Sequence, residues 1–170
     1  MPKPQEAEYD PYYQKYVALV PENEIIPVLD EQTEQLRSLF GDFAEDRGTF
    51  AYEEGKWTLK EVLSHLIDAE RIFGYRVFRI ARGDKTPIEG FEQDGYIENS
   101  HANGRSFSEL LEEFGLLRRA NLLFYKNLQD RDWLRNGTAN KVSISVRALA
   151  WVTAGHVRHH IGVLRSRYQI

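Results

Sequence analysis

The sequence contains no cysteine among its 170 residues. Neither a disulfide nor a thiolate metal site can therefore be built, and the protein supplies no thiol nucleophile of its own. Long apolar runs are also missing: no stretch approaches the roughly 18 apolar residues of a membrane span. The N-terminal residues MPKPQEAEYDPYYQKYV lack the apolar core of a signal peptide. We therefore expect a cytoplasmic protein without a membrane partner.

An excess of positive charge is absent as well. Lys and Arg total 22 against 26 Asp and Glu, a net charge of −4. Nucleic-acid binding relies on clustered basic residues, so this balance argues against a nucleic-acid partner. Arg158, Arg165 and Arg167 alternate with apolar residues and are interpreted as a solvated helix face. With 42% hydrophobic and 28% charged residues, residues 1–170 are expected to form one domain, preceded by an N-terminal arm over 1–23.

Convincing strand alternation is not found anywhere in the chain, whereas helical patterns are frequent. Apolar residues recur at helical spacing over 24–43, 58–82, 106–127 and from 143 or 145 to 167. Capping boxes open the second and third segments, with Thr58 followed by Glu61 and Ser106 followed by Glu109. Gly83 is typical of a helix stop. These patterns predict an all-α protein, a four-helix bundle.

One predicted connection is long for a bundle. Residues 83–103 link the second and third helices, where about 2–8 residues are usual. The segment contains Asp94 and Tyr96, and a structured loop of this length is often a lid over a site. The alternative, that it merely crosses the end of the bundle, carries comparable weight.

Histidine is concentrated near the C-terminus, where three of the five histidines fall within positions 156–160. On a helix His156 and His160 lie about 40° apart, inside the apolar arc, while His159 falls at its edge. Side chains four residues apart have Cβ atoms about 5–6 Å from each other, so both rings can reach one metal ion. Because Val157 follows His156, the glutamate of an HExxH zinc protease is missing.

A third ligand is needed, and His65 in the second helix is the best candidate. It lies at the rim of that helix's apolar arc. A single core histidine usually packs with a satisfied hydrogen bond, but several half-solvated imidazoles in one apolar core would each need a partner. The three together therefore predict a divalent metal site. His101, in the long connection, is interpreted as a surface residue.

Other polar residues of the second helix could contribute to a pocket. Asp68 and Glu70 follow His65, and Glu70 falls within the apolar arc, where it would need an arginine partner. A structural ion pair is favoured for Glu70 over a metal ligand or base. Arg76 lies about three turns beyond His65. It could hold an anionic substrate, although a rim residue extending to solvent is the commoner role.

Small residues recur every seven positions on the last helix, at Ala148, Gly155 and Gly162. They would let another helix approach closely. Trp151 lies on the same side, away from the histidines. The partner could be another helix of the bundle or a second subunit, and we favour a homodimer.

Three segments together resemble the DinB/YfiT-like superfamily. They are Trp57 to Arg71, the Ala81-Arg82-Gly83-Asp84 loop, and Ser145 to Leu149 leading into Gly155 to His160. The resemblance implies a four-helix bundle in which His65, His156 and His160 hold a divalent metal, commonly zinc or nickel, often in a homodimer. Activities known in the superfamily include thiol S-transfer with an external low-molecular-weight thiol and a mycothiol-dependent maleylpyruvate isomerase. Many other members are classed as metal-dependent hydrolases without a defined activity.

Two functional classes remain open from the residues. Three imidazoles leave a coordination position free, as in a catalytic site, where water or an external thiol could act on a small-molecule substrate. The competing class is a non-catalytic dimeric stress-response bundle whose metal is structural or adventitious. A fourth protein ligand, such as Glu70 or Asp94, would favour that alternative. Asp68, Arg76, Tyr96 and His159 complete the candidate pocket residues.

Overall fold

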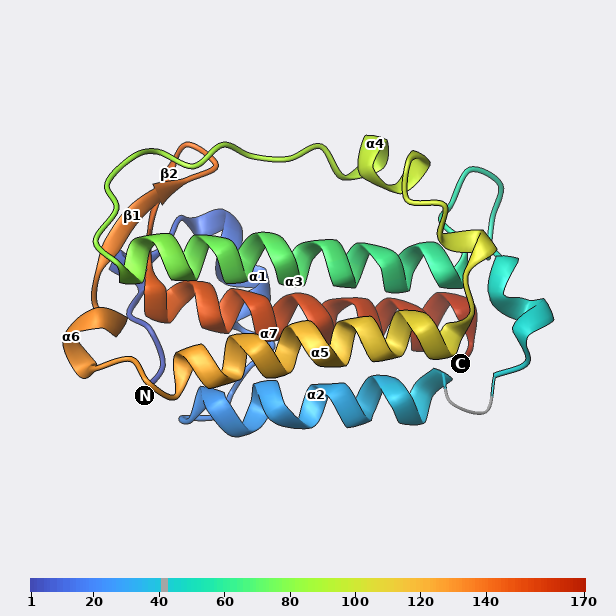
Figure 1. Cartoon of the computed structure of the whole chain (residues 1–170), viewed down its shortest axis with the longest axis horizontal. Helices are drawn as coiled ribbons and strands as arrows, with labels where there is room; N and C mark the ends of the chain where they lie inside the picture. The colour runs from blue at the N-terminus through green and yellow to red at the C-terminus, as the bar shows by residue number, and fades with distance from the viewer. Residues whose placement is uncertain (41–42) are drawn as a thin grey trace.

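The computed structural model describes residues 1–40 and 43–170, and its body consists of four long helices (Figure 1). These are α2 (Ile25–Phe40), α3 (Leu59–Ala81), α5 (Phe107–Tyr125) and α7 (Val146–Val163). The predicted helices over 58–82 and 106–127 agree to within two residues at each end. The first was predicted to reach residue 43, and positions 41–42 of that range lie outside the described residues. The four-helix bundle is confirmed.

The predicted capping boxes define where two of these helices begin. Thr58 accepts from the Glu61 backbone N–H while the Glu61 carboxylate accepts from the Thr58 N–H. Ser106 and Glu109 form the same reciprocal pair ahead of α5. Each box satisfies backbone donors that the first helical turn leaves free. The start of α3 in turn determines the position of His65 along the axis of the bundle.

Consecutive helices of this bundle are not all neighbours. α2 packs against α5 and α7, and α3 packs against the same two helices, so α2 and α3 lie diagonally opposite. Figure 1 shows that α3 and α5 run in the same direction. The chain must therefore return along the full length of α3, about 34 Å for 23 residues, before α5 can begin.

The long connection makes this return. Residues 83–103 run lengthwise over α3 and contain the short helix α4 (Gln93–Glu98) (Figure 1). The alternative that it merely crosses the end of the bundle is wrong, because the segment crosses a side of the bundle. It also passes over the region of the histidines, as described below.

A β-hairpin, which the sequence analysis missed, precedes α7. Strand β1 (Asn136–Ala139) pairs antiparallel with β2 (Val142–Ser145), after the short helix α6 (Asp130–Trp133). Each strand has four residues, too few to show alternation. The two turn residues, Asn140 and Lys141, have φ of 52° and 68°, as in a type I′ turn, but no glycine marks it. Ser145 is consequently the N-cap of α7, its side chain accepting from the Ala148 N–H.

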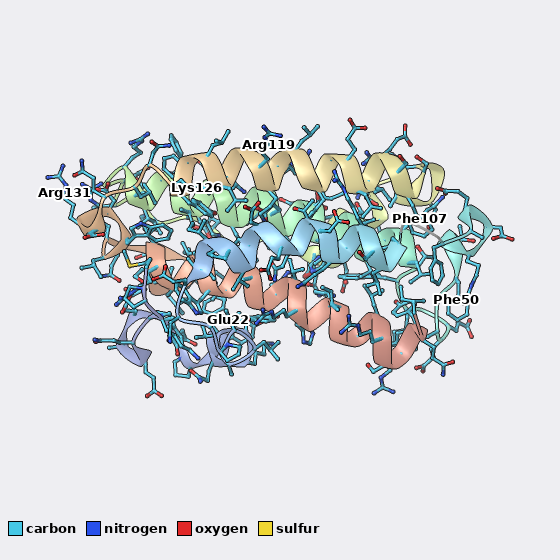
Figure 2. The ribbon with its side chains drawn as sticks, turned by 90° about the horizontal axis from the view of Figure 1, so that it is seen from below. Glu22, Phe50, Phe107, Arg119, Lys126 and Arg131 are labelled. Atoms are coloured by element: carbon cyan, nitrogen blue, oxygen red, sulfur yellow. The ribbon has the colours of Figure 1, made fainter. Side chains whose placement is uncertain are left out.

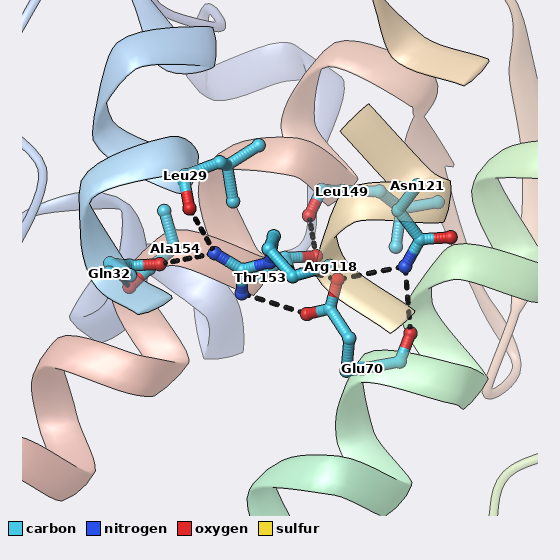
Figure 3. Close-up of polar contacts among 8 residues, drawn as sticks. All are labelled: Leu29, Gln32, Glu70, Arg118, Asn121, Leu149, Thr153 and Ala154. Atoms are coloured by element: carbon cyan, nitrogen blue, oxygen red, sulfur yellow. Dashed lines mark hydrogen bonds and ion pairs between the residues drawn. The ribbon is translucent and has the colours of Figure 1, made fainter. Parts of the chain in front are cut away.

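A buried ion pair crosses the bundle between α3 and α5 (Figure 3). Arg118 is fully buried, and its Nε and Nη2 donate to Glu70 at 2.9 and 2.8 Å. Its Nη1 donates to the carbonyl of Leu29 and the side chain of Gln32. Asn121 donates to the same carboxylate at 2.8 Å. The arginine partner expected for Glu70 is thus present, on the facing helix.

The N-terminal arm covers the outer side of α7, as the view from below shows (Figure 2). Its helix α1 (Gln14–Val17) packs on α7, and a Cβ at Gly155 would overlap the Tyr16 carbonyl oxygen. Trp151 is fully buried. Gly155 therefore accommodates a segment of the same chain, whereas Gly162 is exposed with open space beside it. This corrects the use of Ala148, Gly155 and Trp151 as evidence for a second subunit.

The arm also pairs with two arginines of α7, of which Arg158 was expected to be solvated. Arg147 is buried and pairs with Glu8, while Arg158 pairs with Glu22 and donates to the Leu19 carbonyl. Burial opposes ionisation of Glu8, but hydrogen bonds from Arg147, the Gln5 backbone and Ser145 lower its pKa below the ordinary value. Arg165 and Arg167 remain exposed. Within the described parts of the chain, no helix combines the length and apolarity required to cross a bilayer.

Candidate metal centre

Three histidines from two helices converge inside the bundle. His65 comes from α3, and His156 and His160 come from α7. One ring nitrogen of each lies within 4.8 Å of the others, and the Nε2 atoms of His65 and His156 are 3.1 Å apart. Imidazole nitrogens bound to one zinc ion lie about 2.0–2.1 Å from it. Small rotations of the rings close this spacing onto a single ion, so the donor set fits a divalent metal.

The site lies between two apolar clusters of the core. On α7 the boundary between them falls between Ala154 and Val157, where Gly155 and His156 stand. His65 and His156 are buried, at 2% and 6% exposure, while His160 is partly exposed. The sequence placed His65 at the rim of an apolar arc, but the structure encloses it.

Burial keeps the three rings in the form that binds metal. It lowers the pKa of His65 to about 4 and that of His160 to about 3, and it holds the pKa of His156 well below its ordinary value. The neighbouring imidazoles act in the same direction. All three are therefore neutral at pH 7, with a nitrogen lone pair available to a cation.

Aromatic rings enclose the histidines. Trp57 lies 4.8 Å from His65, and Phe73 lies edge-on 5.5 Å from His156, between ring centroids. Tyr16 of the arm meets both His156 and His159 edge-on, at 5.5 and 5.7 Å. These rings restrict the imidazole orientations and keep the surroundings apolar.

A cavity of about 270 Å³ opens beside His65 and His156. The arm, the hairpin turn and the long connection all supply its wall, and Arg76 and Phe73 supply it from α3. The connection is held in place here because Ile88 donates to the Thr138 carbonyl and accepts from the Asn140 N–H, both at 2.9 Å. The other lining residues are Tyr12, Tyr13, Tyr16, Phe91, Glu92, Gln93 and Asn140.

Tyr16 is the most informative wall residue that the sequence analysis missed. Burial, reinforced by the neighbouring Tyr12, raises the pKa of Tyr16 to about 12. Its hydroxyl therefore remains protonated at neutral pH and can donate a hydrogen bond. The tyrosine-rich stretch YDPYYQKY was visible in the sequence, but which helix it packs against was not.

The other predicted pocket residues lie elsewhere. Glu70 is committed to Arg118, and Asp94 is exposed at the start of α4. Asp68 and Tyr96 line a different cavity, between α3, α4 and α5. His159 is exposed at the edge of Tyr16, and His101 is exposed in the connection. Of the candidate pocket residues outside the three histidines, only Arg76 lines the cavity beside them.

The fold and the histidine cluster define a four-helix-bundle protein with a three-histidine group at its centre. The family model of the DinB superfamily matches residues 29–164, a span that contains all three histidines. The chain belongs to the DinB superfamily.

A comparison with solved structures bears on the fold. The structure of YfiT from Bacillus subtilis, described as a probable metal-dependent hydrolase with an unusual four-helix bundle topology, superposes with a TM-score of 0.78. The two are 19% identical, and the match covers 98% of this chain and 91% of the other. At that identity the likeness shows the fold alone. No curated protein sequence matches the chain.

Proposed function

We propose that the protein is a metal-dependent enzyme acting on a small molecule, with His65, His156 and His160 as the metal ligands. The observation that carries this proposal is the convergence of three neutral imidazoles beside an open cavity. Three protein ligands with a free position are the arrangement of catalytic metal sites, whereas structural sites are closed by a fourth ligand. Zinc or nickel suits three imidazoles, although donor type alone does not choose between them.

The non-catalytic alternative would be favoured by a fourth protein ligand. Among the described residues, the group that could hold an ion consists of the three histidines without a carboxylate. Glu70, the nearest carboxylate in sequence within the core, is held by Arg118 on the other side of α3. This supports the enzyme over a stress-response binding bundle.

In this proposal the ion would activate the nucleophile, and the residues of the cavity wall would orient the substrate. A divalent ion held by the three histidines would supply Lewis-acid activation, of water for hydrolysis or of an external low-molecular-weight thiol for S-transfer. The chain orients the substrate with Phe73, Tyr16 and Arg76, and the protonated Tyr16 hydroxyl is available to donate to a substrate oxygen. YfiT is described as a probable metal-dependent hydrolase, which supports hydrolysis over transfer. We place this activity in the cytoplasm.

Metal content is the deciding measurement. Protein prepared without a histidine tag is analysed by mass spectrometry for the wild type and for His156→Ala. We expect close to one zinc or nickel per chain in the wild type and a loss of most of it in His156→Ala. His101→Ala, an exposed histidine outside the cluster, is the matched control and should retain the metal. Wild-type protein that neither contains nor takes up either ion would overturn the proposal.

A further inference from the structure

Arg76 stands out among the buried charges of the molecule. Its side chain is 3% exposed, yet its contacts are few. Nη2 donates to the Glu89 carbonyl at 3.1 Å, and the buried Nε has no acceptor among the described residues. No carboxylate of the described residues forms an ion pair with it. Burial of a cation without a partner is strongly unfavourable.

Arg118, a buried arginine with a structural role, provides a comparison for the hydrogen bonding of Arg76. All three of its nitrogens donate, to Glu70, Gln32 and the Leu29 carbonyl. Both arginines belong to the bundle, and both are almost completely buried. Arg118 is fully paired and lies away from the histidine cavity, whereas Arg76 is incompletely paired and forms part of its wall.

The position of Arg76 relates it directly to the histidines. Its guanidinium carbon lies 5.9 Å from the centroid of Phe73, and the same ring lies 5.5 Å from His156. The guanidinium and His156 therefore both lie beside the ring of Phe73, in the wall of one cavity. A small molecule bound against this ring could contact both the guanidinium and the metal centre.

We propose that Arg76 binds a carboxylate of the substrate, so that the enzyme acts on small organic acids with an apolar or aromatic body. This assignment rests on the proposed function, because it names the substrate of that same site. A guanidinium fork matches a planar carboxylate, and one arginine suits a single carboxylate. The aromatic wall formed by Tyr12, Tyr13, Tyr16, Phe73 and Phe91 accommodates the apolar body. Glu92 is also in the wall, but its carboxylate accepts from the Asp94 N–H at 3.2 Å and forms no ion pair with Arg76.

Benzoate and its neutral isostere benzamide test the assignment by calorimetric titration of the protein. Titrations are performed on the protein as purified and again after metal removal, since benzoate can also coordinate an ion. We expect wild-type protein to bind benzoate about tenfold or more tightly than benzamide in both states. Arg76→Gln should remove this preference, and Arg76→Lys, which retains the charge without the planar fork, should keep part of it.

Arg71→Gln is the matched control. Arg71 belongs to the same helix but pairs with Glu113 and lines the other cavity, so its removal should leave benzoate binding unchanged. Equal binding of benzoate and benzamide by the wild type would overturn the assignment, and this comparison requires no variant to fold. An unchanged preference in Arg76→Gln would also overturn it.

The metal content of the same samples separates the two proposals. Arg76→Gln should retain the wild-type content, because Arg76 is not one of the metal ligands. A protein that contains metal but shows no carboxylate preference would refute the role of Arg76 alone. A protein that prefers benzoate but never binds metal would refute the enzyme proposal and leave Arg76 as part of an anion-binding site.

Discussion

At the scale of single residues, the buried arginines Arg118 and Arg76 differ in how completely they are paired. Arg118 and Glu70 satisfy each other with two hydrogen bonds in the centre of the bundle (Figure 3). Such a pair gives little net stability relative to apolar residues, but removing one member leaves the other charge buried without compensation. Glu70 on α3 and Arg118 on α5 therefore depend on each other for charge compensation.

Replacing Glu70 by Ala should destabilise the fold severely. We expect the free energy of unfolding to fall by about 3–5 kcal/mol, because Arg118 would remain fully buried without its carboxylate. Urea denaturation followed by circular dichroism measures this. Glu113→Ala is the matched control, since Glu113 also pairs an arginine of α3 from α5 but Arg71 is 47% exposed. Its effect should stay near or below about 1 kcal/mol. Equal losses in the two variants would show that burial does not govern the Glu70 pair.

Residue-scale prediction from sequence succeeded where the geometry is local. The four-residue spacing of His156 and His160 fixes their common face on any helix, and the structure has both rings in one cluster with His65. Tyr16 and Asn140 could not be assigned to the cavity in this way. Their places depend on how the arm and the hairpin pack on helices distant in sequence, which helical spacing does not encode.

At the scale of elements, the packing of the arm on α7 determines one wall of the candidate site. The backbone of Tyr16 lies so close to Gly155 that a side chain there would collide with it. Seven residues further along the same helix, Gly162 has open space where a Cβ would stand. These two glycines therefore form a matched pair within α7.

Gly155→Ala should displace the arm and lower stability. Because the colliding atom belongs to the backbone, relief requires the arm to move, and we expect a loss of about 1–3 kcal/mol. Gly162→Ala should be neutral or stabilise by up to about 1 kcal/mol, since alanine is the better helix former. Chemical denaturation gives both values, and limited proteolysis within residues 1–23 should be faster only in Gly155→Ala. An undiminished stability of Gly155→Ala would contradict the tight packing of the arm.

Element-scale prediction depended on explicit start signals. Two capping boxes located α3 and α5 because a serine or threonine followed by glutamate three residues later acts locally. The sequence did not predict the hairpin because its strands have only four residues and its turn uses Asn140 and Lys141 at positive φ without glycine. The route of residues 83–103 was not predicted because the relative direction of two helices in a bundle depends on tertiary packing and not on local sequence.

At the scale of the whole molecule, the candidate site joins segments from most of the chain. Its histidines come from α3 and α7, 91 positions apart for His65 and His156, and its wall comes from the arm, the long connection and the hairpin. The homodimer remains a prediction. The arm covers Gly155 of the α7 stripe from which it was inferred, whereas Gly162 of the same stripe is exposed with open space beside it.

Because a metal at this site would connect α3 to α7, it should stabilise the entire fold. A ligand that binds only the folded state adds about 2.7 kcal/mol at 100 times its dissociation constant. For a chain of this length that corresponds to a rise in Tm of about 5–10 °C. We expect this rise when zinc is added to metal-free wild-type protein in differential scanning calorimetry.

The controls distinguish the histidine cluster from other binding. His156→Ala should lose the zinc-dependent rise, since it removes one of the three donors, while Arg76→Gln should keep it because its donor set is intact. Magnesium should have no effect on the wild type, as that ion prefers oxygen ligands. A similar rise in His156→Ala would place the zinc elsewhere on the molecule, and the convergence of the imidazoles would then reflect packing and not metal binding.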